Sequence, residues 1–71
     1  MTVKALYSYD AQEEGELSFE ENEILINVVE VPGEGWWSGN NSKGQYGMFP
    51  SNYVTSVIKN EILKITFLLN Y

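Results

Sequence analysis

The side chains in this sequence that could perform acid–base chemistry are carboxylates. The chain has ten acidic residues and four lysines, and it has no histidine, cysteine or arginine. It therefore lacks the commonest general base, the commonest metal ligand and the thiolate ligand of zinc sites. Three glutamates, Glu13, Glu14 and Glu16, fall in the stretch QEEGE. This polar stretch predicts an open loop without a desolvating pocket, so we expect no catalytic residue, no cofactor and no metal.

Aromatic side chains form the second distinctive set. The stretch GEGWWSGNN, residues 33–41, places Trp36 beside Trp37. Neighbouring side chains of a strand point to opposite faces, so one tryptophan can pack on a core while the other faces away. Five tyrosines and two tryptophans are also difficult to bury completely in 71 residues. The composition therefore indicates an exposed aromatic surface.

Four motifs occur in one order along the chain, namely ALYSY at 5–9, ELSF at 16–19, GWW at 35–37 and GMFPSNYV at 47–54. Together they resemble the Src homology 3 domain over about residues 2–57, with a pattern closest to the cortactin-type branch of cortical-actin proteins. The resemblance implies a non-catalytic module that binds Pro-x-x-Pro segments of other proteins. Ser8 stands where the family usually has an acidic residue. That position usually faces away from the ligand, so we expect little effect.

The resemblance also implies an aromatic groove. A polyproline II peptide is stiff before it binds, and it needs flat apolar rings and polar donors for its carbonyl groups. By resemblance Trp36 walls the groove, Trp37 is structural and Asn52 donates to a ligand carbonyl. The predicted groove residues are Tyr7, Tyr9, Trp36, Met48, Pro50, Asn52 and Tyr53.

The acidic loop has a role in the same resemblance. Glu16, with Glu13 and Glu14 beside it, would face a lysine or arginine that flanks the prolines of the ligand. The net charge of −6 agrees with a basic partner and argues against nucleic acid. Exposed ion pairs contribute only about 0.2–1 kcal/mol each, so the larger effects would be on ligand orientation and association rate.

Each of these residues also has a purely structural interpretation. Tyr7 and Tyr9 share strand parity, so both could lie in the core. Pro50 could end a strand, and Tyr53 could cap a barrel. Met48 could fill a packing gap, and the acidic loop could serve only solubility.

Short strands must position all of these side chains. The β-branched stretch ILINVVEV at 24–31 predicts the longest strand. Shorter strands are expected at 2–7, 36–39, 45–49 and 54–58, with turns at 20–23, 32–35, 40–44 and 50–53. This series predicts an all-β fold. The resemblance specifies a small five-stranded Src-homology-3-like barrel of two orthogonally packed sheets.

The strands also predict a core, consisting of Val3, Ala5, Leu17, Phe19, Leu25, Val28, Phe49 and Val54. Gly39 is expected where a side chain would crowd the sheet. Asn27 interrupts the apolar strand, which leaves the register between Leu25 and Val31 open, with a bulge as one solution.

The expected domain covers residues 1–58, followed by a hydrophobic extension, KNEILKITFLLNY, at 59–71. The extension fits a helix or a strand equally well. One interpretation is self-association, in which it pairs with another copy. The other is a disordered or non-native end. The sequence has no signal-peptide pattern and no apolar run near the ~20 residues of a membrane span. We therefore expect a cytoplasmic module, at the actin cortex by resemblance.

Overall fold

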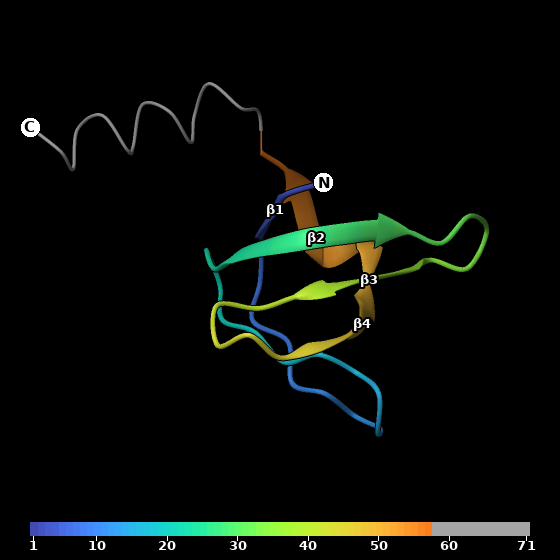
Figure 1. Cartoon of the computed structure of the whole chain (residues 1–71), viewed down its shortest axis with the longest axis horizontal. Helices are drawn as coiled ribbons and strands as arrows, with labels where there is room; N and C mark the ends of the chain where they lie inside the picture. Colours follow the sequence, from blue (N-terminus) through green and yellow to red (C-terminus); the bar gives the residue numbers. More distant parts are fainter. Residues whose placement is uncertain (58–71) are drawn as a thin grey trace, which may run out of the picture.

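The computed structural model describes residues 1–57, and the extension predicted at 59–71 lies outside the described residues. Five strands form the described part (Figure 1). They are β1 (Val3–Ala5), β2 (Ile24–Glu30), β3 (Trp36–Asn40), β4 (Tyr46–Pro50) and β5 (Val54–Ser56), with the short 3-10 helix η1 (Ser51–Tyr53) before β5. The all-β, five-stranded fold class predicted from the sequence is confirmed. The boundary at residue 58 and the self-association of residues 59–71 stay predictions.

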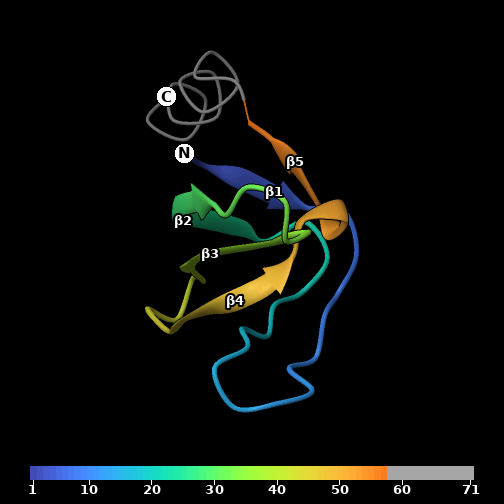
Figure 2. The same ribbon diagram turned by 90° about the vertical axis from the view of Figure 1, so that its right-hand side faces the viewer.

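The strands lie in the order β4-β3-β2-β1-β5, and all neighbours are antiparallel. Figure 2 shows this order from β5 to β4, with the long loop between β1 and β2 beyond β4. Strand β2 pairs with β1 through Ile24 and Leu25, and it pairs with β3 from Ile26 to Glu30. The two sheets expected from the sequence are therefore continuous, because β2 belongs to both groups of strands.

A bulge divides these two parts of β2. The pairing with β3 shifts by one residue between Ile26 and Val29, and Asn27 has a φ of 54°. Asparagine tolerates this left-handed conformation better than the β-branched residues around it. The extra residue lets Leu25 and Val28 both reach the core although they are three positions apart. The bulge considered from the sequence is thus present at Asn27.

Within residues 1–57, the buried apolar residues are the eight that the sequence predicts, namely Val3, Ala5, Leu17, Phe19, Leu25, Val28, Phe49 and Val54. Phe49 is the largest fully buried side chain, and its ring meets that of Phe19 edge-on at 5.7 Å. The expected crowding at Gly39 is also confirmed. A Cβ there would lie 2.9 Å from Cγ2 of Val28 and 3.1 Å from the carbonyl oxygen of Ile26.

Backbone hydrogen bonds attach the long loop to β4. The amide of Leu17 donates to the Met48 carbonyl at 2.8 Å, and the Met48 amide donates to the Gly15 carbonyl at 2.9 Å. This approach requires glycine at position 47. A Cβ there would lie 2.8–2.9 Å from backbone atoms of Gly15, Glu16 and Leu17. The loop that carries the glutamates is therefore held in place by β4.

Gly47→Ala is expected to destabilise the domain by about 1–3 kcal/mol, the usual cost of overpacking. The contacting atoms are all backbone, so the loop itself must move. Urea unfolding measures the change, with Gly39→Ala for comparison. That substitution should cost less, because the nearest atom to its new Cβ is a side-chain methyl of Val28. Equal urea unfolding midpoints for wild type and Gly47→Ala would show that the loop at Gly15–Leu17 can move to accommodate a Cβ without loss of stability.

Candidate functional site

Four aromatic rings that are distant in the sequence form a continuous row. Tyr7 meets Tyr53 at 5.6 Å, Tyr53 meets Tyr9 at 5.4 Å, and Tyr9 meets Trp36 at 6.4 Å between ring centroids. All three contacts are edge-to-face, an arrangement that aromatic pairs prefer. Tyr7 is 56% exposed and the other three rings are partly exposed. The row therefore presents ring surface to the exterior.

Pro50 and Asn52 belong to the segment that leads from β4 to Tyr53 of this row. Pro50, the last residue of β4, pairs with Trp36 across the sheet and is partly exposed. Asn52 is exposed on η1. The amide of Ser51 donates to the Gly35 carbonyl at 3.0 Å, which fixes η1 against the start of β3. The structure thus brings together Tyr7, Tyr9, Trp36 and Tyr53 by ring contacts and places Pro50 beside Trp36, whereas Asn52 is exposed on η1 next to Tyr53.

An open hollow of about 330 Å³ continues from the aromatic row. Its lining residues are Glu13, Glu14, Gly15, Glu16, Trp36 and Met48. Trp36 belongs to both parts, since it also contacts Tyr9. Every predicted acidic residue lines this hollow. The structure therefore places an anionic compartment directly beside the aromatic rings.

The side chains of Trp36 and Trp37 lie on opposite faces of β3, as the alternation of side chains along a strand requires. Trp37 packs against the core cluster, whereas Trp36 lines the hollow. Tyr7 is too exposed to be a core residue, but Tyr9 and Tyr53 pack against the core and also contact the row. Tyr9 and Tyr53 therefore both support the core and contribute ring surface to the aromatic row.

A short hydrogen bond links the aromatic row to the acidic loop. The Tyr9 hydroxyl donates to Oε1 of Glu16 at 2.6 Å, and the amide of Gln12 donates to the same oxygen at 2.9 Å. The bond from Tyr9, followed by that from the Gln12 amide, holds the pKa of the Glu16 carboxyl below its usual range. The same bond, with burial, raises the pKa of Tyr9 to about 12. Glu16 is therefore ionised and fixed in direction at neutral pH.

Tyr9→Phe is expected to raise the pKa of Glu16 toward its ordinary value, because the mutant lacks the donor that favours the carboxylate. The stabilisation from this bond is present above the ordinary pKa of glutamate, and it is lost as pH falls through the lower pKa of the folded state. The stability difference between wild type and mutant should thus shrink in acid. NMR titration of the Glu16 carboxyl carbon measures the pKa. Tyr46→Phe serves as a control on an exposed tyrosine, and an unchanged pKa in Tyr9→Phe would refute the assignment.

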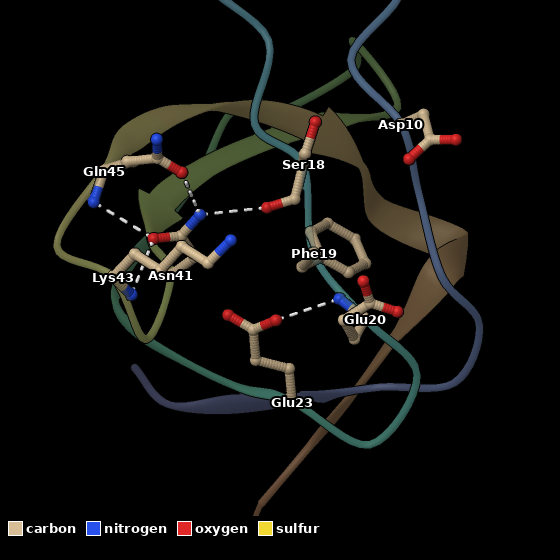
Figure 3. Close-up of a pocket in the computed structure, with 8 residues that line it drawn as sticks. All are labelled: Asp10, Ser18, Phe19, Glu20, Glu23, Asn41, Lys43 and Gln45. Carbon is tan, nitrogen blue, oxygen red and sulfur yellow. Dashed lines mark hydrogen bonds between the residues drawn. The ribbon is translucent and has the colours of Figure 1, made fainter.

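A smaller hollow of about 70 Å³ lies on another part of the surface, between the long loop and the β3–β4 turn (Figure 3). Buried Asn41 donates to the Ser18 carbonyl at 2.9 Å and accepts from the amides of Lys43 and Gln45 at 3.0 Å. Glu23 accepts from the Glu20 amide at 2.9 Å, and it also accepts from the amide and hydroxyl of Ser42. These groups are used to hold two turns together.

Glu23 has a structural role in the smaller hollow, because its carboxylate accepts hydrogen bonds from residues of two different turns. Burial raises the pKa of this carboxyl, but hydrogen bonds from Glu20 and Ser42 more than offset burial, so its pKa lies below the usual range. The sequence alone predicts no role for Glu23 or Asn41, nor for Gln12, Gly15 and Gly47. The only sequence signal was the Asn- and Gly-rich stretch at 40–44, which predicts a turn but not the residue it contacts.

Residues 1–57 contain neither a membrane-spanning helix nor a cluster of metal ligands. No helix in this part of the chain is long and apolar enough to cross a membrane. These residues also contain no group of three or more His, Cys, Asp or Glu side chains that could hold a metal ion.

Similarity to known proteins agrees with this geometry. The chain is 50% identical over 56 residues to protein app1 of Schizosaccharomyces pombe, and 48% identical over 54 residues to mouse drebrin-like protein. These alignments cover 79% and 76% of the chain, but only 6% and 12% of the two relatives. The chain thus corresponds to a small part of each of these proteins.

Solved structures of whole domains are similar along nearly their full length. The SH3 domain of the yeast actin binding protein Abp1 is 44% identical, with a TM-score of 0.73, and the alignment covers 82% of this chain and all of that one. The C-terminal SH3 domain of myosin IB from Entamoeba histolytica, solved with a bound peptide, is 44% identical with a TM-score of 0.70, over 80% of this chain and 92% of that one. Residues 5–55 match the family model described as variant SH3 domain. The chain therefore belongs to the SH3 domain family, as its four motifs predict.

Proposed function

We propose that this chain is a module that binds proline-rich Pro-x-x-Pro segments of other proteins in the polyproline II conformation. SH3 domains are non-catalytic interaction modules, and the similar myosin IB domain has been solved with a peptide. The observation that carries the proposal is the row of four aromatic rings that ends in an acidic hollow.

The aromatic row supplies the contacts that a polyproline II helix requires. Such a helix has three residues per turn and no internal hydrogen bonds, so its prolines and its carbonyl groups are both available. Ligand prolines would lie between Tyr7 and Tyr53, and between Tyr53 and Trp36. Pro50 would form the floor beside Trp36, and the Asn52 amide would donate to a ligand carbonyl. The rings are already in mutual contact, so little ordering is required on binding.

The acidic hollow selects a basic residue beside the prolines. A lysine or arginine side chain would enter between Trp36 and the loop, with Met48 against its aliphatic part. Glu16 is held by Tyr9 and Gln12, so its charge faces the hollow in a fixed direction. Glu13 and Glu14 add negative charge at the rim. We expect this part of the site to set the orientation and association rate of the ligand more than its affinity.

The proposed setting is the cytoplasm at the actin cortex. The name of one similar structure, an actin binding protein of yeast, supports this setting. A module of this kind would join its parent protein to a proline-rich partner there.

Two peptides in a tryptophan fluorescence titration test the proposal. One carries a Pro-x-x-Pro segment with a flanking arginine, and the other has alanine in place of the arginine. We expect saturable binding of the first at roughly micromolar Kd, since the contact is small, and weaker binding of the second. Equal affinities for the two peptides would show that the acidic hollow does not recognise the flanking arginine. No binding of either peptide by the folded chain would reject the proposed function.

A further inference from the structure

The outer face of β2 carries three aliphatic side chains that the proposed peptide site does not use. Ile24, Ile26 and Val29 are 39%, 47% and 60% exposed. The bulge at Asn27 produces this arrangement, because it keeps Leu25 and Val28 in the core and leaves Ile26 and Val29 outside. Three exposed β-branched residues on one central strand form an apolar patch, which we call the β2 patch.

Strand register connects the β2 patch to the end of β5. Val3 pairs with Leu25 on one side and with Ser56 on the other. The preceding residue, Thr2, accepts a hydrogen bond from the Val57 amide at 3.1 Å. The Val28 amide donates to the Met1 carbonyl at 2.8 Å, so Thr2 lies between Val57 and the bulge at Ile26 and Asn27. The described chain therefore ends two strands from Ile26, about 10 Å at the usual strand spacing.

The same row extends to the opposite edge of the sheet. Ile26 pairs with Asn40, and Asn40 pairs with Tyr46, which is 68% exposed. Val57, Ile26 and Tyr46 thus lie on one path of paired residues across all five strands. Along the curved sheet this path is about 19 Å long at ~4.8 Å per strand.

The sequence that follows Val57 has the composition that such a surface would bind. Residues 59–71 contain six large apolar side chains, namely Ile62, Leu63, Ile65, Phe67, Leu68 and Leu69. Their charged residues are Lys59, Glu61 and Lys64, a net charge of +1, whereas nine acidic residues and two lysines give residues 1–57 a net charge of −7. Residues 58–71 would span about 21 Å as a helix and more when extended, so the segment is long enough for this path.

We propose that residues 59–71 pack on the β2 patch of their own chain and extend toward Tyr46. A tether that starts two strands away gives this segment an effective concentration of the order of millimolar, which favours the same chain over a second copy in dilute solution. Figures 1 and 2 show that the end of β5 lies on the side of the molecule away from the long acidic loop. The described chain therefore ends on the side opposite the loop that carries the acidic residues.

A spin label in the full chain tests this placement. The chain has no cysteine, so Asn70→Cys gives a single attachment point for a nitroxide. We expect selective loss of NMR amide peak intensity at Ile26, Val29 and Tyr46, with intensity retained at Glu13 and Glu14. Reduction of the nitroxide should restore the lost peaks. This readout involves no peptide ligand, so its result does not depend on the proposed function.

Two further experiments determine whether the β2 patch is covered by residues 59–71 of the same chain or of a second copy. Ile26→Glu with Val29→Glu should remove the selective loss, whereas Ala11→Glu, which adds charge to the exposed loop on the far side, should leave it intact. The second arm mixes isotope-labelled chain that lacks the cysteine with spin-labelled chain that lacks isotope. Loss of the same peaks in this mixture would assign the segment to a second copy and overturn the proposal. Absence of selective loss in the single-chain experiment would overturn it as well.

Discussion

Trp36→Ala is expected to weaken binding of the arginine-flanked proline-rich peptide by at least about thirtyfold, the effect of a 2 kcal/mol interface hot spot. Trp36 is the one side chain that belongs to both the aromatic row and the acidic hollow. Removal of the Trp36 ring would shorten the aromatic row and open one side of the acidic hollow. Isothermal titration calorimetry measures the change in Kd, and urea unfolding shows whether the fold persists.

The fold is expected to survive this substitution, because Trp36 lies outside the buried core and Trp37 packs against it. Tyr46→Ala provides a matched control, since it removes an aromatic ring of 68% exposure that lies outside the groove. The control should bind the peptide with unchanged affinity. Retention of wild-type affinity by Trp36→Ala would mean that the ligand lies elsewhere on the domain.

Phe49→Ala is expected to leave the domain largely unfolded at 25 °C. Removal of a buried phenylalanine typically costs 3–5 kcal/mol, and the side chain of Phe49 is fully buried against Phe19. A domain of this size has only about 3–9 kcal/mol of stability in total, from 0.05–0.15 kcal/mol per residue. Far-UV circular dichroism with urea titration measures the loss of structure.

Thr55→Ala is the appropriate control for Phe49→Ala. Thr55 is exposed on β5 and belongs neither to the β2 patch nor to the peptide site, so shortening it should change the unfolding free energy by no more than about 0.5 kcal/mol. A cooperative unfolding transition near the wild-type midpoint in Phe49→Ala would contradict the central place given to this ring in the core.

The core was predictable because it depends on local pattern. Phe49 and Val54 flank the Pro-Ser-Asn-Tyr turn of a recognisable motif, and the alternation around Leu25 fixes which side of β2 is apolar. Asn27 interrupts that alternation at the position where the bulge occurs. Gly39 was also predictable, since β3 must pass close to its neighbour at that point.

Other parts of the site depend on contacts between distant segments, and no local pattern reveals them. The bond between Tyr9 and Glu16 requires the loop to fold back on itself, and the contact of Gly47 with the same loop requires the register between Glu16 and Met48. The length of the first strand was also overestimated. The strand predicted over 2–7 is β1 at Val3–Ala5, because Tyr7 leaves the sheet to join the aromatic row.

The pairing of β1 with β5 has a consequence for how the domain folds. Val3 and Ser56 lie opposite each other near the two ends of the described chain, so their pairing closes nearly the whole domain into one loop and carries the largest entropic cost of closure. The β3–β4 pairing instead spans one short turn, so we expect it to form earlier. Folding time should therefore be set by the docking of the chain ends, in the millisecond-to-second range of sheets with mainly non-local contacts.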